Sequence, residues 1–300
     1  MRREDRAGSD CAIEQALDVV GDTWSLLIVR DIAGGVTRFD ALAHELSVSR
    51  KVLTGRLAAL VEAGVVAKRA YSNRPPRHDY VLTARGEALL PVLLALQDWG
   101  TRHVLGDGSL TGTAEPASAE ARRVEALVGT RLPALALASY DGEPVDPVSV
   151  EHRLTALFCF PGAYPPGMLG YPPGWSDIPG TAGCTLEART YAARHDELAA
   201  LGVAVHGVST QRPDQLAAFA THESLPYTML SDQDGLLAGS LRLPSFRAAG
   251  TDRLKRTTLL VDADRVVRHV QFPITDPAGS VAELLVAAAD AVRSPGHGSQ

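Results

Sequence analysis

The residue best suited to covalent chemistry in this 300-residue chain is Cys184, which follows a glycine-rich turn. Residues 179–187 read PGTAGCTLE, and the apolar spacing beyond them predicts a helix over 186–201 with Glu187 on its solvated face. Cys184 is then placed in or just before the first turn of that helix. Unpaired backbone N–H groups and the positive end of the helix dipole favour an anion there, so we expect the thiol to ionise more readily than in solution.

A reactive thiolate at this place needs further donors, because the dipole of a surface helix supplies too little stabilisation alone. Thr181, three residues earlier, can offer a hydroxyl, and an arginine from elsewhere in the chain can offer a guanidinium. The alternative is that Cys184 is a small, inert residue of the core, as buried cysteines often are.

The same segment resembles the active-site loop of the peroxiredoxins, Pro-x-x-x-Thr-x-x-Cys, and especially that of the bacterioferritin-comigratory type. The resemblance extends over about residues 124–292 and includes LFCFP at 157–161 and RTTLLVD at 256–262. It implies an α/β thioredoxin-like fold with thiol-dependent peroxidase activity. By the same resemblance Cys184 is the peroxidatic cysteine, Thr181 its hydroxyl partner, and Arg256 the guanidinium that holds thiolate and peroxide together.

Two features depart from the peroxiredoxin pattern. Asp177 occupies the position of the motif's proline, and a Gly/Pro-rich insertion over 162–175 enlarges the loop before the site. Arg189 stands where the comigratory type often has its resolving cysteine. A sulfenic acid at Cys184 must then be reduced by an external thiol, by one of the other two cysteines, or by another subunit.

The second cysteine, Cys159, lies inside the apolar run 154–160. Such a run predicts a buried parallel strand, so core packing is the expected role of Cys159.

Composition excludes several classes of protein. Hydrophobic residues make up 45% of the chain and charged residues 21%, as in ordinary globular proteins. Three cysteines are too few for a disulfide scaffold, and no apolar run approaches the roughly 18 residues that a membrane span needs. Because residues 1–11 are charged and contain no apolar signal region, we expect a cytoplasmic protein without a membrane partner. We expect no metal site and no cofactor, since no Cys-x-x-Cys and no histidine pair at helical ligand spacing occurs.

Charge is concentrated in the N-terminal part, where residues 47–86 hold eight basic and two acidic residues. The pattern there predicts a helix over 38–46, a tight turn, a second helix from an N-cap at Ser49 to residue 63, and two strands over 65–71 and 78–83. This arrangement is a winged helix with a basic surface suited to double-stranded DNA. The candidate DNA-binding residues are Arg50, Lys51, Thr54, Arg56, Arg74 and Arg77. A solvated charged surface is the alternative.

Residues 11–100 resemble the HxlR-type winged-helix transcription regulators. The markers include GDTWSLLI at 21–28, SRKVLT at 49–54, RPP at 74–76 and YVLT at 80–83. The resemblance implies a homodimer built partly from the N-terminal helix and from a helix over 84–103. Several regulators of this type sense oxidants through a cysteine near the N-terminus, which makes Cys11 a redox-sensing candidate; packing at the dimer interface is the alternative.

The expected fold class is therefore a winged helix-turn-helix, mainly α with a β-hairpin wing, followed by an α/β thioredoxin-like fold. We assign 1–105 to the DNA-binding domain, 106–121 to a flexible linker, 122–294 to the peroxiredoxin-like domain and 295–300 to a disordered tail. This fusion predicts a regulator that senses peroxide or another oxidant and is reset by an external thiol. The alternatives are a peroxidase whose DNA-binding domain is autoregulatory, and a regulator with a catalytically silent ligand-binding or partner-binding module.

Overall fold

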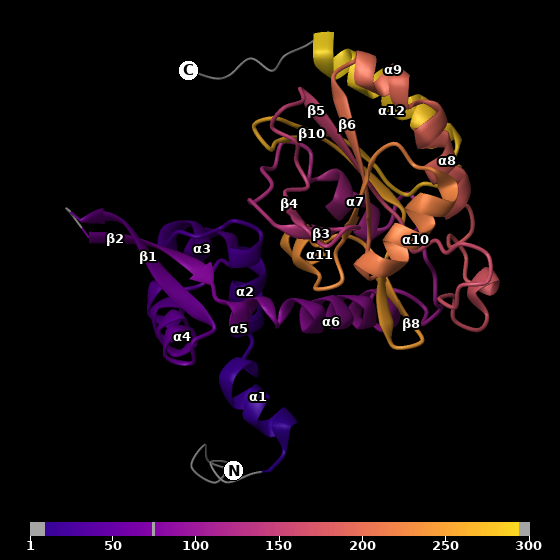
Figure 1. The fold of residues 1–300 in the computed structure, drawn as a ribbon. Helices are drawn as coiled ribbons and strands as arrows, with labels where there is room; N and C mark the ends of the chain where they lie inside the picture. Colours follow the sequence, from indigo (N-terminus) through magenta and orange to yellow (C-terminus); the bar gives the residue numbers. More distant parts are fainter. Residues whose placement is uncertain (1–9, 74–75, 294–300) are drawn as a thin grey trace. The chain divides into compact units, whose positions relative to one another are not determined.

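The computed structural model describes residues 10–73 and 76–293. The chain divides into two compact units, residues 1–93 and 94–300 (Figure 1). The first unit is helical with one β-hairpin, and the second contains a mixed seven-stranded sheet with helices on both faces. The predicted two-domain fold class is thus confirmed.

The first unit has the order of elements that the sequence predicts. It contains α1 (Ala12–Val20), α2 (Ser25–Ala33), α3 (Phe39–Glu45), α4 (Arg50–Glu62), β1 (Val66–Asn73), β2 (Pro76–Leu82) and α5 (Ala84–Glu87). Ser47 adopts a positive φ of 49° in the turn between α3 and α4, and the Ser49 hydroxyl accepts a hydrogen bond from the Val52 N–H at the start of α4. The helix-turn-helix therefore has the cap that its sequence indicates.

The core of this unit is made by the apolar face of α4. Leu53, Leu57 and Leu60 are buried against residues of α2, α3 and the hairpin. The hairpin strands are antiparallel, with Val66 opposite Leu82. The helix expected over 84–103 is two helices, because α5 ends at Glu87 and α6 (Leu90–His103) begins three residues later.

In the second unit, β5 (Leu154–Cys159), β6 (Val203–Ser209) and β7 (Thr228–Ser231) are parallel at the centre of the sheet. Antiparallel strands flank them: β10 (Thr257–Asp262) and β11 (Val267–Gln271) on one side, β3 (Leu137–Ser139) and β4 (Pro144–Val145) on the other. The order is β11-β10-β5-β6-β7-β3-β4. A separate hairpin joins β8 (Ser245–Ala248) to β9 (Thr251–Leu254).

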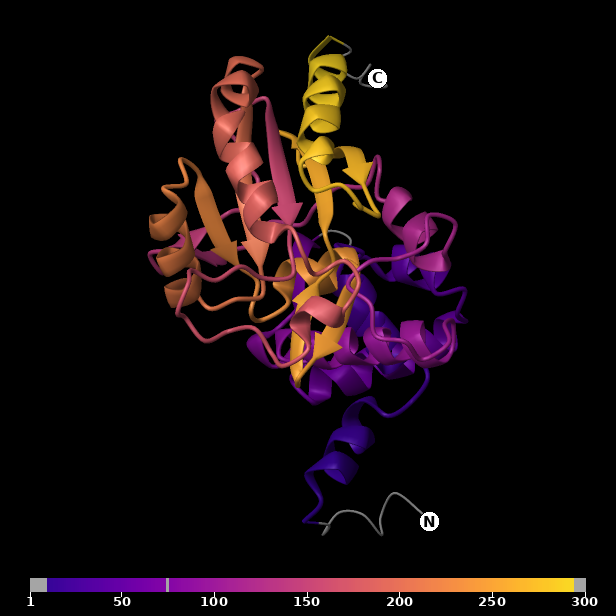
Figure 2. The ribbon, with the colours of Figure 1, turned by 90° about the vertical axis from the view of Figure 1, so that its right-hand side faces the viewer.

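Each face of the sheet carries its own hydrophobic cluster. Figure 2 views the face covered by α8 (Cys184–Ala193) and α12 (Gly279–Arg293), whose residues join α9 (His195–Ala200) and α10 (Pro213–Glu223) in the first cluster. The second cluster, on the other face, includes α11 (Leu236–Leu241) and Leu94 of α6. Because side chains alternate along β5, Phe158 belongs to the first cluster and Cys159 to the second.

The expected boundaries between the domains differ from the observed ones. The chain divides between Leu93 and Leu94, inside α6, rather than after residue 105. The segment expected to be a linker was 106–121, but α7 (Ala119–Glu125) begins inside it, and residues 106–118 are tied to the second unit by hydrogen bonds. We call residues 106–118 the connector. Its Gly, Ser and Thr content indicated flexibility, but the Gly112 N–H and the Thr113 carbonyl oxygen find partners in the folded unit, at Pro179 and Lys255.

Within residues 10–73 and 76–293, no helix combines the length and apolarity needed to cross a membrane.

Candidate active site and DNA-binding surface

Cys184 is the first residue of α8, as its sequence context predicts. Gly183 precedes it with a φ of +98°, and a Cβ at this position would lie 2.7 Å from the Pro277 Cγ atom. Both observations require glycine here. The expected single helix over 186–201 is instead split at Arg194 into α8 and α9, which leaves the start of α8 unchanged.

The sulfur of Cys184 is enclosed by polar groups, although the residue is only 5% exposed. An Nη of Arg256 donates to the Sγ at 3.3 Å and to the Ala182 carbonyl oxygen at 3.0 Å. The Gly162 N–H also donates to the sulfur. Arg256 therefore lies where the resemblance expects it, and it can stabilise a negative charge on the sulfur.

Arg256 has a second buried partner that the sequence did not predict. Its Nε lies 3.1 Å from an oxygen of Glu187, a residue with no exposed surface. The expected place of Glu187 on a solvated face is thus wrong. The helical pattern alone could not reveal this, because the charge that Glu187 meets comes from Arg256, which directly precedes β10, far along the chain.

Burial reverses the expected direction of the Cys184 pKa. Desolvation raises the pKa of this thiol above its ordinary value, and the nearby Glu187 adds to the rise, while Arg256 and the Gly162 N–H act in the opposite direction. Burial also raises the pKa of Glu187 to about 8, although Arg256 favours its ionised form. The raised pKa increases the neutral fraction of Glu187 at a given pH, which leaves more of the guanidinium charge to the sulfur.

Thr181 is near Cys184, but its hydroxyl does not contact the sulfur. The hydroxyl donates to the carbonyl oxygens of Trp175 and Ile178, both at 2.8 Å, and it is the Thr181 carbonyl that accepts from the Cys184 thiol at 3.4 Å. In this conformation Thr181 holds the loop that carries the cysteine rather than the thiolate itself. The role of hydroxyl partner stays a prediction for the state that holds peroxide.

The Gly/Pro-rich insertion forms an aromatic cover beside the site. Tyr164, Tyr171, Trp175 and Phe246 follow one another with ring centroids 4.8 to 6.1 Å apart. The Arg253 guanidinium lies 4.7 Å from the Trp175 centroid and donates to the carbonyl oxygens of Pro161, just before the insertion, and Gly170, inside it. The larger loop therefore does not expose the sulfur to water.

Cys159 is fully buried in β5, as predicted, and burial raises the pKa of its thiol. It belongs to the hydrophobic cluster on the opposite face of the sheet from Cys184. Formation of a disulfide between the two would require the sheet to be disrupted.

The exposed face of α4 carries part of the predicted DNA-binding set. Arg50, Lys51 and Thr54 are exposed together with Gly55 and Ala58, whose small size permits close approach of another surface. Arg50 forms an ion pair with Asp40 and lies 4.7 Å from the Phe39 ring centroid. The Thr54 hydroxyl donates to the Arg50 carbonyl oxygen at 2.8 Å.

The other predicted DNA-binding residues are placed differently. Arg56 extends from the flank of α4 and lies 3.3 Å from Asp22, so it is not on the face with Lys51 and Thr54. Helical spacing explains this, since residues 51 and 56 are five positions apart and therefore point about 140° apart around the helix axis. Arg77 is exposed on β2, whereas Arg74 lies outside the described residues. Cys11 is exposed and directly precedes α1.

Two parts of the chain match different families. Residues 19–106 match the HxlR-like helix-turn-helix family, and residues 178–270 match the AhpC/TSA family. An uncharacterised HTH-type transcriptional regulator of Mycobacterium tuberculosis is 40% identical over 93 residues, which are 31% of this chain and 59% of the regulator. The chain thus spans a little over half the length of that relative.

The C-terminal part has relatives of another kind. Peroxiredoxin Bcp of Escherichia coli is 30% identical over 145 residues, which are 47% of this chain and 83% of Bcp. The crystal structure of peroxidoxin BcpB from Mycobacterium tuberculosis is similar with a TM-score of 0.46 and 24% identity, covering 54% of this chain and 96% of that one. The chain therefore joins two families: its N-terminal domain is an HxlR-like helix-turn-helix, and its C-terminal domain is a member of the AhpC/TSA family related to the Bcp peroxiredoxins.

Proposed function

We propose that the chain is a DNA-binding transcriptional regulator that senses peroxide or another oxidant through Cys184. The observation that carries this proposal is the hydrogen bond from the Gly112 N–H in the connector to the Pro179 carbonyl oxygen in the cysteine loop, at 2.7 Å. It ties the segment that leads from the DNA-binding domain to the loop where oxidation would occur.

The chemistry at Cys184 begins with the thiolate, held by the Arg256 guanidinium at 3.3 Å. The thiolate sulfur attacks one oxygen of the hydroperoxide, the O–O bond breaks, and the other oxygen leaves with a proton as water or an alcohol. Cysteine is oxidised to sulfenic acid and the peroxide is reduced. An external thiol then forms a mixed disulfide with the sulfur and releases water, and a second thiol restores Cys184.

The mixed disulfide cannot form in the closed arrangement, because Cys184 is 5% exposed and begins a helix. Its formation requires the first turn of α8 and residues 179–183 to move outward. Gly180 has a φ of +84°, and a Cβ there would lie 2.8 Å from the Gly112 carbonyl carbon and from Thr113. A loop packed this closely on the connector cannot move without displacing it.

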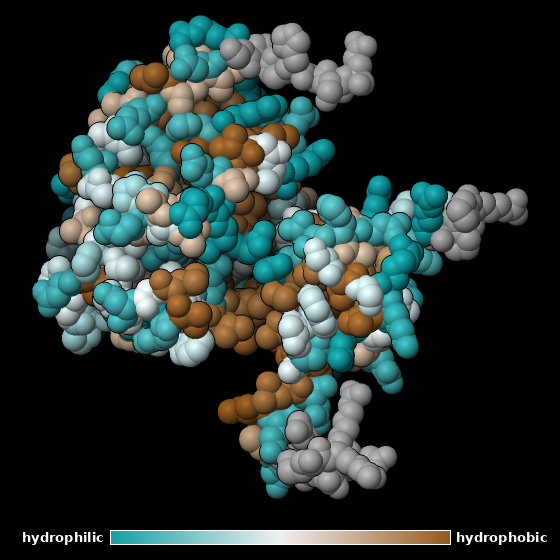
Figure 3. Space-filling model, turned by 180° about the vertical axis from the view of Figure 1, so that it is seen from behind, coloured by the Kyte–Doolittle hydropathy of each residue, from teal (hydrophilic) through white to brown (hydrophobic). Residues whose placement is uncertain are grey.

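DNA binding is proposed for the exposed face of α4, with Lys51 and Arg50 as its charged residues and Arg77 of the hairpin beside the backbone of the duplex. The Asp40 carboxylate that pairs with Arg50 must be exchanged for a phosphate. We also propose a homodimer, since Ile13 and Leu17 on α1 are 70% and 53% exposed, and α1 presents apolar side chains in Figure 3. We further propose a cytoplasmic location, where the helix-turn-helix of such a regulator would meet its DNA.

The test is binding of the reduced protein to the DNA upstream of its own gene at fixed salt, before and after one equivalent of peroxide. We expect the affinity to change and to be restored by a thiol. Cys184→Ser should keep the reduced affinity and lose the response, whereas Cys11→Ser and Cys159→Ser should respond as the parent does. A response that persists in Cys184→Ser would refute the proposal.

The second candidate is a thiol-dependent peroxidase whose DNA-binding domain is autoregulatory. The contact between Arg256 and the Cys184 sulfur favours it, because this contact serves turnover as well as sensing. Rapid peroxide consumption with external thiol, together with a DNA affinity that does not change on oxidation, would select this candidate.

The raised pKa of the Cys184 thiol favours a third candidate, in which the C-terminal domain is a catalytically silent binding module. A slow reaction of Cys184 with peroxide would select this third candidate.

A further inference from the structure

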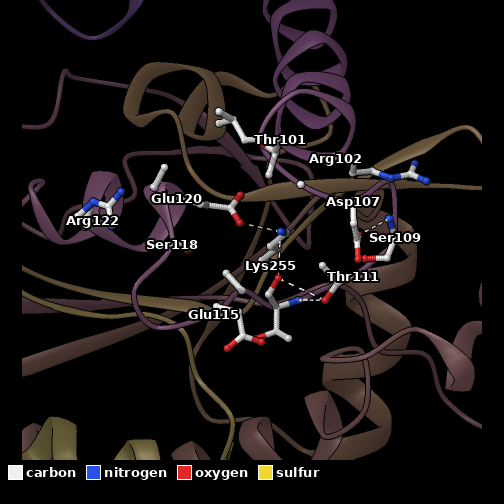
Figure 4. A pocket seen from close by; sticks show the side chains of 15 residues that line it. Thr101, Arg102, Asp107, Ser109, Thr111, Glu115, Ser118, Glu120, Arg122 and Lys255 are labelled. Carbon is white, nitrogen blue, oxygen red and sulfur yellow. Dashed lines mark hydrogen bonds and ion pairs between the residues drawn. The ribbon is translucent and has the colours of Figure 1, made fainter.

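A cavity of about 440 Å³ lies between the connector and the rest of the second unit (Figure 4). Its walls come from the end of α6, the connector and the start of α7, and Lys255 reaches it from the opposite side. Cavities of this size accept a small organic molecule. The Cys184 sulfur is not part of it.

A buried ion pair stands at the inner wall of the cavity. The Lys255 Nζ lies 2.7 Å from an oxygen of Glu120 and also donates to the Thr113 carbonyl oxygen at 3.0 Å. The two side chains are 3% and 5% exposed. Figure 4 shows the two side chains directed toward each other, with a dashed line for the contact between them. An ammonium has three N–H donors, so one remains for a ligand.

Three polar atoms in the walls have unused hydrogen-bonding capacity. The second carboxylate oxygen of Glu120, the Thr113 hydroxyl oxygen and the Arg102 Nε are buried without a hydrogen-bond partner among the described residues. The Arg123 guanidinium lies 3.8 Å from that Glu120 oxygen, within ion-pair range but beyond hydrogen-bond distance. Buried polar groups are normally paired, so an unpaired acceptor and two unpaired donors in the walls of one cavity indicate a bound partner that supplies the complement.

The charges on the walls define the class of that partner. Three basic and three acidic residues line the cavity: Arg102, Arg122, Lys255, Asp107, Glu115 and Glu120. Leu105, Ala114 and Ala119 add apolar surface. A simple anion or cation would leave one set of wall charges opposed, whereas a molecule with both charges satisfies the two sets.

We propose that this cavity binds a small zwitterion of the size of an amino acid or a dipeptide. Its ammonium is held by the Glu120 oxygen that accepts no hydrogen bond, its carboxylate by the remaining Lys255 N–H, and its side chain by the apolar wall. The Thr113 hydroxyl bonds to either polar group. The site does not depend on peroxide chemistry, because none of its groups contacts Cys184.

The experiment is titration calorimetry of the full chain with the standard amino acids and with alanyl-leucine. For an amino acid that binds, the matched compounds lacking its amino group or its carboxylate are titrated in parallel; for leucine these are 4-methylpentanoate and isopentylamine. We expect saturable binding of at least one zwitterion, at least tenfold tighter than either matched compound. Absence of saturable binding across the panel, or equal affinity for the compounds with one charge, would overturn the proposal.

Variants in the wall test the location. Thr113→Val removes a hydroxyl that has no partner among the described residues, so the unliganded protein loses no hydrogen bond there, and affinity should fall about fivefold. Thr113→Ser should restore it. Ala114→Phe fills the cavity and should abolish binding, whereas Ala117→Phe, on an exposed residue outside the lining, should not. Binding that survives Ala114→Phe would place the ligand elsewhere and refute the site.

Discussion

Both the Glu187 carboxylate and the Cys184 thiolate can pair with Arg256, and replacing Glu187 by glutamine removes the first of these charges. In the parent protein, the Glu187 carboxyl lies 3.1 Å from the Arg256 Nε and titrates with a pKa of about 8. Well below pH 8 the carboxyl is neutral, so glutamine changes little. Above pH 8 the carboxylate repels the Cys184 thiolate and competes for the guanidinium, and glutamine removes both effects. The Cys184 pKa should therefore fall in Glu187→Gln.

The magnitudes follow from the geometry. An opposite charge within about 4 to 6 Å shifts a pKa by about 1 to 3 units, and the Arg256 guanidinium is 3.3 Å from the sulfur. Arg256→Met should raise the Cys184 pKa by about 2 units, which lowers the thiolate fraction about a hundredfold. Glu187 raises the Cys184 pKa both by its own charge and by competing for Arg256, so Glu187→Gln should lower that pKa by about 1 unit, with a tenfold gain in thiolate confined to alkaline pH.

The assay is the rate of Cys184 alkylation by iodoacetamide as a function of pH, in a Cys11→Ser background and read by peptide mass spectrometry. Glu197→Gln is the control, since Glu197, on α9, is an exposed carboxylate whose partner is Arg194 rather than Arg256. Its pH profile should match that of the background. If Glu187→Gln reacts more slowly than the background above pH 8, or if Arg256→Met leaves the profile unchanged, the proposed charge balance is wrong.

Three further predictions concern stability and DNA binding. Because the folded-state pKa of Glu187 is raised, its stabilising contribution is present below the ordinary value of 4.5 and is lost as pH rises through about 8; urea unfolding should show this decline in the parent and a flatter profile in Glu187→Gln. Gly183→Ala should cost about 1 to 3 kcal/mol in the same measurement, since φ is +98° and Pro277 blocks the Cβ, and an unchanged stability would contradict that strain. Lys51→Ala should weaken DNA binding across sequences and reduce the salt slope by about one, whereas Arg153→Ala, in the other domain, should not.

The sequence was sufficient for features set by local chemistry. Ser49 caps α4, Leu53 and Leu57 are buried, and Cys184 begins α8, because caps, periodicity and glycine turns act within a few residues. The contact of Arg256 with the sulfur was expected only from the resemblance, since no spacing rule connects residues 72 positions apart.

What the sequence could not provide depends on tertiary burial. Glu187 has the spacing of a solvated residue, yet Arg256 makes its burial possible. Burial also outweighs the helix terminus at Cys184, so the direction of its pKa was predicted wrongly. The break at Arg194 carries no glycine or proline to signal it, and the connector looks flexible until its hydrogen-bond partners at Pro179 and Lys255 are known.

The position of Cys159 bears on whether the domain senses or turns over. The chain has three cysteines, and Cys159 is separated from Cys184 by the sheet itself. Cys11 belongs to the other unit. Within the second unit no thiol is therefore placed to capture a sulfenic acid at Cys184, and the lifetime of the oxidised state is set by the supply of external thiol. A slow supply of thiol lowers the turnover rate of a peroxidase. For a regulator the same condition is useful, because the oxidised form persists while oxidant exceeds thiol and disappears when thiol recovers.

Arg189→Cys would supply a cysteine on α8 at the position of a resolving thiol. It should shorten the lifetime of the sulfenic acid, measured by trapping with dimedone. An unchanged lifetime would show that α8 does not open after oxidation, and the proposed route to the connector would fail with it.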